Sequence, residues 1–164
     1  MTIHSSHPFA TPPEQRDAAR RLRGRLASTV SLWLAGAGRA RVGLTVSSML
    51  VALGEPARVL GLVDPDSDLA AGLSDRFTVV LLAEGDHGIA EAFAGLAPAP
   101  GGLFREGFGD TDWGPVLPGR SWAGVRLEST RELGWSREVV GVIDHVELVE
   151  GEPLLHLQGR YRTA

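Results

Sequence analysis

Three hydroxyl side chains lie close together in the segment Val42–Leu50, VGLTVSSML. Read as a β-strand, the segment alternates, with Gly43, Thr45 and Ser47 on one face. The opposite face is apolar and is expected to pack in a core through Val42, Leu44, Val46 and Leu50. Serine and threonine hydroxyls, together with backbone N–H groups, can bind a phosphate without a lysine. The segment therefore has two interpretations, a phosphate site or a half-exposed strand with small polar residues.

The position of Ser48 sets a geometric condition on the phosphate interpretation. Neighbouring residues of a regular strand point to opposite faces. Ser47 and Ser48 can therefore reach one phosphate only if the strand bends or bulges between them.

Metal binding has weak support in the sequence. The five histidines, at positions 4, 7, 87, 145 and 156, are scattered, and the two with a ligand-like spacing, His4 and His7, lie in the loose N-terminal segment rather than on an expected helix or strand. Asp64, Asp66 and Asp68 alternate as at the start of a Ca²⁺ loop, but the closing glutamate is missing because Asp75 stands there. We interpret these aspartates as helix-capping residues and expect no metal.

Motifs for nucleophilic catalysis and for nucleotide loops are missing as well. The sequence has no Gly-x-Ser-x-Gly elbow and no cysteine. The glycines of Gly36–Gly43 match neither G-x-G-x-x-G nor the P-loop, and they connect two expected strands, whereas those motifs lead into a helix. The catalytic residues, if the protein is an enzyme, remain unknown from motifs.

The composition is that of an ordinary globular protein of 164 residues. The formal net charge of −4 argues against a nucleic-acid partner, and all sixteen basic residues are arginine. No apolar run is long enough to cross a membrane, and the N-terminus has no secretory signal pattern. We therefore expect a cytoplasmic protein that binds neither membranes nor nucleic acids.

The first part of the chain is expected to hold a flexible terminus, a helix and a hairpin. Residues 1–12 are polar and proline-rich, and residues 13–164 are expected to form one domain. A helix is expected from Pro13 to about Ser28, capped by Thr11, with an apolar stripe and a solvated arginine face. The stripe consists of Ala18, Leu22 and Leu26. Thr29–Ala35 and the segment starting at Val42 are then expected to pair as a hairpin.

The middle of the chain alternates strands with short helices. Ala57–Val63 and Arg76–Ala83 are almost entirely apolar, which predicts strands buried on both faces. Between them, Asp64 or Asp66 is expected to cap a short helix that ends near Gly72. A second short helix is expected over Asp86–Leu96.

The last third begins with a long loop, residues 97–120, rich in glycine and proline. Three strands are expected after it: Ser121–Leu133, Arg137–Leu148 and Pro153–Tyr161. Because strands follow one another without regular β-α alternation, the pattern favours a mainly β protein, an antiparallel barrel with short helices and an N-terminal helix.

The order of these segments resembles that of a known family. The stretch GLTVSSMLVALGEPARVLGLVDPDSDLAAGLSDRFTVVLL and the C-terminal GRYR, Gly159–Arg162, are similar to the flavin reductase-like family. The resemblance is spread over residues 28–162. It implies an FMN-binding split β-barrel, and a homodimer with flavin near the subunit interface.

The resemblance also implies positions for the flavin contacts. Thr45, Val46, Ser47 and Ser48 would line the phosphate and ribityl chain. Two more residues follow the buried strand. Asp64 would lie close to the ribityl hydroxyls, and Ser67 would add a second hydroxyl. Weaker correspondences place three residues of the long loop over the ring and one residue near the interface: Phe104, Arg105, Trp113 and Tyr161.

Three departures from the family pattern affect the expected chemistry. Val80 stands where many relatives have asparagine, and Trp135 and Ser136 stand where many have an Asp-His pair linked to nicotinamide handling. The aspartates around Ser67 would repel a phosphate. An arginine such as Arg39, Arg41 or Arg105, or one from a partner subunit, would have to compensate.

The resemblance implies an enzyme, a flavin-binding oxidoreductase that reduces FMN or FAD with NAD(P)H and supplies reduced flavin to a monooxygenase. In such chemistry a hydride passes from the nicotinamide to the flavin, and the protein supplies position and a dry pocket. Two alternatives stay open: a split-barrel flavoprotein with another substrate, and a non-catalytic flavin carrier.

Overall fold

The structure is a computed structural model, and it describes residues 17–105 and 107–164. The expected flexible segment 1–12 and the expected cap Thr11 lie outside the described residues.

The N-terminal helix α1, Ala18–Gly24, is shorter than its sequence pattern predicts. Within the described residues it starts at Asp17, whose carboxylate accepts a hydrogen bond from the Arg20 N–H at 2.7 Å. The helix ends at Gly24 rather than near Ser28, because Ser28 already pairs in a strand. No residue of α1 is buried, so its leucine stripe does not pack on its own domain.

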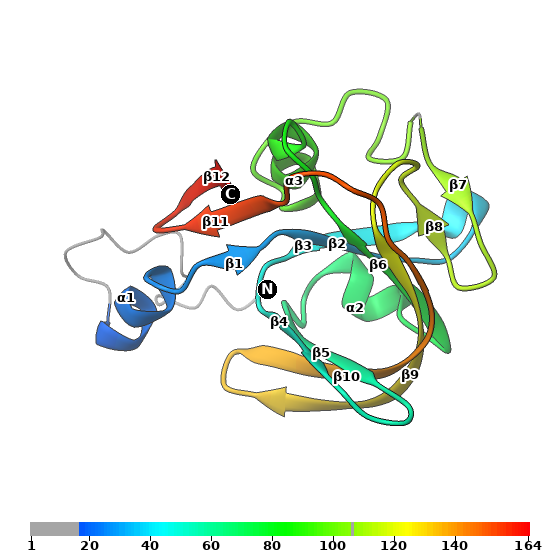
Figure 1. Ribbon diagram of the computed structural model, residues 1–164, viewed down its shortest axis with the longest axis horizontal. Coiled ribbons are helices and arrows are strands. Elements are labelled where there is room, and N and C mark those ends of the chain that lie inside the picture. The colour runs from blue at the N-terminus through cyan, green and yellow to red at the C-terminus, as the bar shows by residue number, and fades with distance from the viewer. Residues whose placement is uncertain (1–16, 106) are drawn as a thin grey trace.

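Seven antiparallel strands form one curled sheet in the order β3-β2-β6-β9-β10-β5-β4 (Figure 1). This is the expected mainly β barrel. The two edge strands, β3 and β4, are consecutive in the chain and are joined by residues 47 and 48 alone. The seven strands are β2 (Ser31–Ala35), β3 (Val42–Val46), β4 (Met49–Ala52), β5 (Arg58–Val63), β6 (Arg76–Leu81), β9 (Trp122–Leu133) and β10 (Ser136–Glu147).

Two small sheets lie outside the barrel: β1 (Ser28–Thr29), β11 (Leu154–Leu157) and β12 (Arg160–Thr163) form one, and β7 (Gly109–Asp110) and β8 (Pro115–Val116) the other. The expected single strand Pro153–Tyr161 is therefore wrong, since a hairpin turn divides it. Gln158 and Gly159 both have a positive φ, of 52° and 76°, as a tight hairpin turn requires. The long loop 97–120 contains the β7–β8 hairpin.

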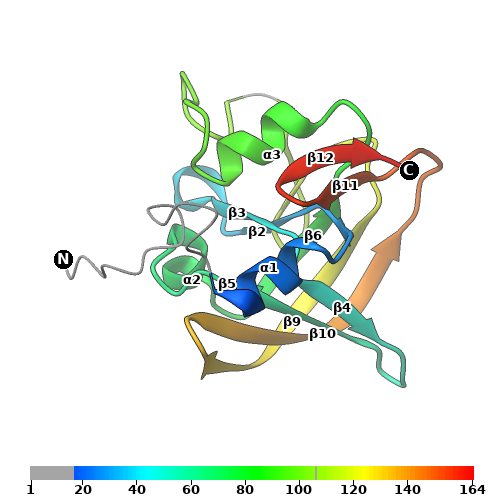
Figure 2. The same ribbon diagram turned by 90° about the vertical axis from the view of Figure 1, so that its left-hand side faces the viewer.

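Two further helices cover opposite faces of the β2–β3 hairpin (Figure 2). Helix α2 spans Asp68–Gly72 and α3 spans His87–Phe93, while the β2–β3 connection holds a 3₁₀ turn, Gly38–Ala40. The cap of α2 is Ser67, so the expected capping by Asp64 or Asp66 is wrong. The Asp64 carboxylate instead accepts a hydrogen bond from the Asp66 N–H.

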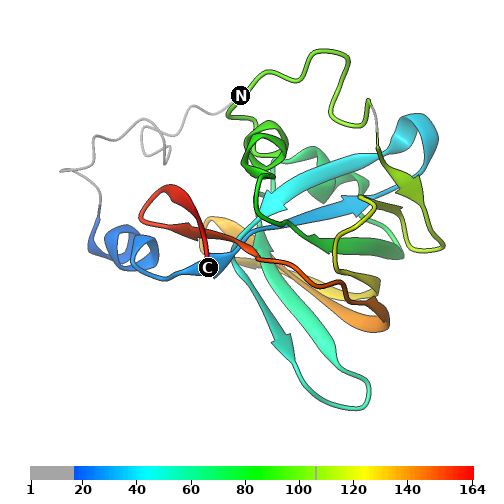
Figure 3. The same cartoon turned by 45° about the horizontal axis from the view of Figure 1, so that its top comes forward.

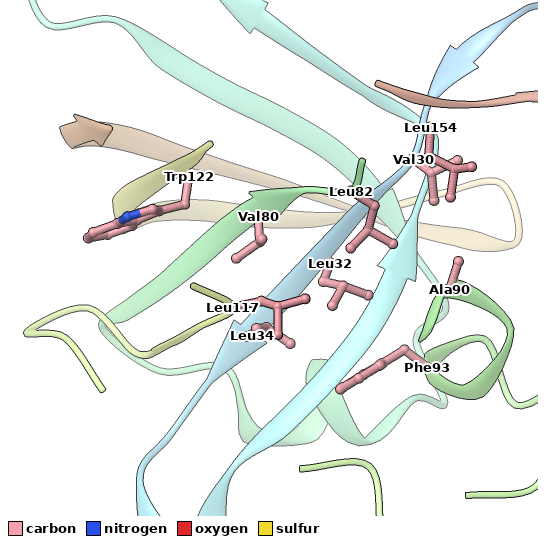
Figure 4. Packing of buried hydrophobic residues seen from close by; sticks show 10 residues of the cluster. All are labelled: Val30, Leu32, Leu34, Val80, Leu82, Ala90, Phe93, Leu117, Trp122 and Leu154. Carbon is pink, nitrogen blue, oxygen red and sulfur yellow. The ribbon is translucent and has the colours of Figure 1, made fainter. Parts of the chain in front are cut away.

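The barrel has a hydrophobic cluster on each face of its sheet. The inner cluster holds Trp33, stacked on Phe77 with ring centroids 5.0 Å apart, and α2 closes it through Leu69. The outer cluster lies under α3 and β11, where Phe93 and Leu154 pack on β2 and β6 (Figure 4). The two clusters explain why β6, which contributes to both, is buried on both faces as predicted.

Burial along β5 and β4 differs from the prediction. β5 alternates, and Leu62 is 36% exposed, because α2 and the inner cluster cover only the face of Val59 and Val63. The spacing predicts Leu50 in the core, but Leu50 is 67% exposed, since the chain leaves its strand after Val46 and the β4–β5 hairpin projects from the body (Figure 3).

Replacing Gly61 by alanine is expected to lower the free energy of unfolding by about 1–3 kcal/mol. An added Cβ would lie 2.6 Å from the ring of Trp33, which is fully buried and cannot move aside. Urea unfolding measures the change. The matched control is Gly88→Ala in α3, where a Cβ meets nothing within 4 Å and helix propensity predicts a small gain. Equal stability of the two variants would contradict this account of the core.

Candidate functional site

The chain passes from one edge of the barrel to the other at Ser47 and Ser48, which we call the hydroxyl turn. Val46 still pairs with Ser31 of β2, whereas Met49 already pairs with Gly61 of β5. Regular pairing is thus interrupted between these residues. An interruption of this kind is what two serines reaching one ligand would require.

The end of β5 lies beside the hydroxyl turn. The Ser48 carbonyl accepts a hydrogen bond from the Leu62 N–H at 2.9 Å. Asp64 follows two residues later, and Ser67 then starts α2. The structure therefore brings Ser47, Ser48 and the Asp64–Ser67 turn to one end of the barrel.

Of the four serine and threonine hydroxyls predicted to contact the flavin, two already donate a hydrogen bond within the protein. Thr45 Oγ1 donates to the Ala90 carbonyl of α3 at 2.6 Å. Ser67 Oγ donates to the Asp64 carbonyl at 2.6 Å and accepts from an α2 N–H as the helix cap. Among residues 17–105 and 107–164, neither Ser47 Oγ nor Ser48 Oγ forms a hydrogen bond, so both can donate to a phosphate oxygen.

Val46 is the last residue of β3 and directly precedes the hydroxyl turn. Its side chain is buried in the inner cluster, and its carbonyl accepts a hydrogen bond from Ser31 Oγ at 2.6 Å. The same Ser31 hydroxyl lies 3.2 Å from the Met49 sulfur. Val46 and Met49, which flank the hydroxyl turn, are therefore both held by Ser31.

Phe104 and Arg105 lie in a different part of the molecule. Phe104 packs against Phe93 with ring centroids 5.2 Å apart, and the Arg41 guanidinium lies over its ring. Arg41 precedes β3, so it is separated from Ser47 by the length of that strand, about 20 Å. Within one protomer, Phe104 and Arg105 do not share a site with the hydroxyl turn.

Trp113 lies at that same far end of the barrel. It packs on Gly124 of β9, where a Cβ would come within 2.4 Å of the indole, and it stacks on His145 at a centroid distance of 5.2 Å. Gly124 pairs with Thr78 near the start of β6, whereas the hydroxyl turn lies by the end of β6 at Leu81.

Tyr161 lies in β12, opposite His156 across the hairpin. Burial, with a smaller effect from Glu91, raises the pKa of the Tyr161 hydroxyl. Burial and then the charge of Arg23 lower the pKa of His156, which favours its neutral form. A cavity of about 810 Å³ lies between this hairpin and α3, which also supplies the hydrogen-bond partner of Thr45.

The segment that follows β5 beside the hydroxyl turn is acidic, and Arg137, which lies opposite Val63 on β10, is already paired with Glu132. Asp64, Asp66 and Asp68 are exposed in that segment. Arg41, one of the arginines considered for compensation, pairs with Asp110 at 2.8 Å at the far end of β3. Arg39 lies in the 3₁₀ turn at the same far end. A phosphate at the hydroxyl turn would therefore need a cation from elsewhere.

A buried ion pair that sequence reasoning missed links α3 to the segment before β9. Arg120 donates two hydrogen bonds to the Asp86 carboxylate, at 2.9 and 2.6 Å, and Asp86 also accepts from the Ala83 N–H. The Asp86 side chain is almost fully buried. The two residues are 34 positions apart, and no local pattern signals their contact.

The part of the chain that the structure describes contains no group of three or more histidine, aspartate or glutamate side chains placed to hold a metal ion. Among the described helices, none is long and apolar enough to cross a membrane.

Comparisons with known proteins identify the family. The sequence model of the flavin reductase like domain matches residues 23–164. The chain is 32% identical over 150 residues to the reductase component of 4-hydroxyphenylacetate 3-monooxygenase from Thermus thermophilus, covering 90% of this chain and 95% of that protein. These sequence matches confirm the expected kind of enzyme, a flavin-reducing oxidoreductase.

Solved structures confirm the fold. The flavin reductase PheA2 in its native state superposes with a TM-score of 0.82 at 19% identity, over 91% of this chain and 99% of that chain. The NADH:FAD oxidoreductase SgcE6 of Streptomyces globisporus C-1027 gives 0.78 at 22% identity, over 93% and 94%. The styrene monooxygenase flavin reductase of Pseudomonas putida S12 gives 0.77 at 21%, over 90% and 97%. The match to the family model and the 32% identical relative show that the chain belongs to the flavin reductase like domain family.

Proposed function

We propose that the protein is the reductase component of a two-component monooxygenase, which reduces FAD or FMN with NADH or NADPH and passes reduced flavin to its oxygenase. The observation that carries the proposal is the 32% identity to a monooxygenase reductase component across nearly the whole length of both proteins. Among the structurally similar proteins, SgcE6 is an NADH:FAD oxidoreductase that has been solved with NAD and FAD fragments, and the flavin reductase HpaC has been solved with NADP⁺. FMN and a homodimer are expectations from the family resemblance.

The hydroxyl turn fits the phosphate end of a flavin nucleotide. Its two free donors, Ser47 and Ser48, stand at an irregular strand junction and would hold the phosphate oxygens. Asp64, at the end of β5, is proposed beside the ribityl hydroxyls. Thr45 and Ser67 would position the neighbouring α3 and α2, because their own hydrogens are used.

When bound, a flavin would supply the redox chemistry of hydride acceptance from a nicotinamide and electron delivery to an oxygenase. The chain's contribution is to bind, orient and exclude water. The acidic surroundings of the hydroxyl turn lead us to propose that a partner subunit provides the compensating cation. The far-end residues Phe104, Arg105 and Trp113 could then meet a flavin only across a subunit boundary.

The spectrum of the purified protein and a turnover assay test the proposal together. We expect flavin absorbance after incubation with FAD or FMN, a higher melting temperature with flavin, and loss of nicotinamide absorbance when NADH or NADPH is added. Each flavin is tested with each nicotinamide to find the preferred pair. Protein that neither binds flavin nor gains thermal stability from it would overturn the assignment.

A flavin carrier without turnover is the second candidate. One observation favours it: Trp135 in the β9–β10 turn and Ser136 at the start of β10 stand where the family resemblance implies an Asp-His pair, and Trp135 is exposed beneath the Arg20 guanidinium. Flavin binding without any oxidation of NADH or NADPH would support the carrier and exclude the reductase.

A further inference from the structure

A sulfur atom lies directly beside the hydroxyl turn. The sequence has two methionines, Met1 and Met49, and no cysteine. Met49 is the first residue of β4, so it follows Ser48 without a gap. Its side chain packs against the inner cluster, and part of the residue remains open to solvent. The thioether is therefore both accessible and close to the proposed flavin site.

One buried hydroxyl contacts the residues on both sides of the hydroxyl turn. Ser31 is fully buried in β2, where its Oγ donates to the Val46 carbonyl at 2.6 Å and lies 3.2 Å from the Met49 sulfur. A serine hydroxyl has one hydrogen, and a thioether sulfur is a weak acceptor, so the short bond to Val46 dominates. The backbone on either side of Ser47 and Ser48 thus depends on how this one hydrogen is shared.

Oxidation of the thioether to a sulfoxide would change that sharing. A sulfoxide turns an apolar side chain into a polar one, and its oxygen is a stronger acceptor than the sulfur was. Because Met49 packs against an apolar cluster, the added oxygen needs a donor, and the Ser31 hydroxyl is already in contact with the sulfur. Either this hydroxyl leaves the Val46 carbonyl, or the sulfoxide stays unpaired and moves. Both outcomes displace a residue that flanks the hydroxyl turn.

Flavin reduction itself supplies the oxidant. Dioxygen reoxidises free reduced flavin and is thereby reduced to hydrogen peroxide, so reduced flavin that does not reach an oxygenase produces peroxide. Peroxide then transfers one oxygen atom to a thioether. The O–O bond breaks, the S–O bond forms, the sulfur is oxidised by two electrons, and the other oxygen leaves as water with both hydrogens.

We propose that Met49 is an oxidation site through which hydrogen peroxide lowers the flavin affinity of this protein. Turnover that wastes reduced flavin on dioxygen would then slow itself, and enzymatic reduction of the sulfoxide would restore the thioether. The inference rests on the proposed position of the flavin at the hydroxyl turn, and it adds a regulation of that site.

Peptide mass spectrometry combined with a flavin titration tests the proposal. Flavin-free protein is treated with increasing hydrogen peroxide, the excess is removed with catalase, and FAD and FMN are titrated by fluorescence. We expect one added oxygen atom on the peptide that contains Met49, and a flavin dissociation constant at least about fivefold higher in the oxidised protein. Methionine sulfoxide reductases that act on both epimers should reverse the two changes together.

Two variants of Met49 serve as matched controls. Met49→Leu keeps a similar apolar volume but has no sulfur, so it should bind flavin nearly as the natural protein does, before and after peroxide. Met49→Gln places an amide oxygen in the region of the sulfoxide oxygen, so it should bind flavin more weakly without any peroxide. If peroxide weakened flavin binding equally in Met49→Leu and in the natural protein, oxidation at other residues would be the cause and the proposal would fail.

Ser31→Ala tests the route through the shared hydrogen. This variant removes the bond to the Val46 carbonyl in both redox states, so its flavin affinity should be lower before treatment and should fall little further after it. A full additional loss on oxidation would overturn the coupling through Ser31. The melting temperature of the flavin-free protein is a second measurement, and peroxide should lower it in the natural protein but not in Met49→Leu.

The outcomes separate this inference from the proposed function. A Met49 that resists peroxide under conditions that oxidise a short peptide of the same sequence would overturn the inference and leave flavin reduction intact. A sulfoxide at Met49 that leaves flavin affinity unchanged would do the same. If the natural protein bound no flavin but still lost thermal stability on oxidation, the proposed function would fail while the oxidation site would stand.

Discussion

Alanine at Ser47 or at Ser48 should weaken flavin binding by about 1–3 kcal/mol each, which is roughly a 5- to 150-fold rise in the dissociation constant. The physical reason is that both hydroxyls have free hydrogens at an irregular strand junction, and a hydrogen bond to a charged phosphate is stronger than one to a neutral group. Fluorescence titration with FMN and FAD gives the affinity. The folded state should be little affected, since neither hydroxyl bonds to another described residue.

Thr45→Val and Ser67→Ala are the matched controls for the serine variants. Each removes a hydroxyl that already donates within the protomer, from Thr45 to the Ala90 carbonyl and from Ser67 to the Asp64 carbonyl. Both should cost about 1 kcal/mol of unfolding free energy and leave flavin affinity nearly unchanged. Unchanged affinity in both serine variants, or an equal loss in all four, would remove the phosphate assignment from the hydroxyl turn.

Replacing Arg120 by alanine should destabilise the protein by about 3 kcal/mol at neutral pH, because the Asp86 carboxylate stays buried without its cation. Arg120 contributes two of the three hydrogen bonds that this carboxylate accepts, and the third comes from the Ala83 N–H. Chemical denaturation followed by circular dichroism measures the change. Arg131→Ala, which breaks an exposed pair with Glu138, should have little effect.

The same ion pair predicts a pH dependence. Burial alone would raise the pKa of Asp86, but the hydrogen bonds from Arg120 and Ala83 and the charge of Arg120 outweigh it, so the pKa is lowered. Because the folded-state pKa is below the unfolded one, this stabilisation is complete above the usual carboxyl pKa and is lost as the pH falls through the folded value. The difference between the natural protein and Arg120→Ala should therefore shrink in acid. A constant difference down to about pH 3 would contradict the assigned role of Asp86.

Local patterns in the sequence predict much of the fold. The apolar run Phe77–Leu81 is a two-sided buried strand because both hydrophobic clusters use it. The alternation at Val42–Val46 gives the inward face of β3 correctly. The order of motifs identifies the family because it reflects the order of these strands along the chain.

The errors arise where non-local contacts or backbone geometry decide. Leu50 is apolar at the correct spacing, but the chain changes strands between Val46 and Met49, so its side chain leaves the core. Gln158 takes a left-handed conformation, for which glutamine gives little signal, and this splits one expected strand into a hairpin. Ser67 caps α2 in place of the nearby aspartates, since it stands immediately before the first helical residue.

The candidate site is only partly readable from the sequence. The family resemblance predicts ten flavin-contacting residues. It does not show that the hydroxyls of Thr45 and Ser67 already donate hydrogen bonds within the protein, nor that Phe104 and Trp113 lie at the opposite end of the barrel. Those facts depend on how α3 and the long loop pack, and packing partners many residues apart leave no periodic pattern.

The hydroxyl turn also joins the two edges of the seven-stranded sheet, β3 and β4. Each edge strand pairs on one side only, so within the sheet these are the strands with the fewest neighbours, and they are expected to open most readily in local fluctuations. A ligand held by Ser47 and Ser48 would bind at the junction between these two edge strands. Because either edge strand could open only after the ligand dissociates, binding of one ligand would stabilise both edge strands against local unfolding.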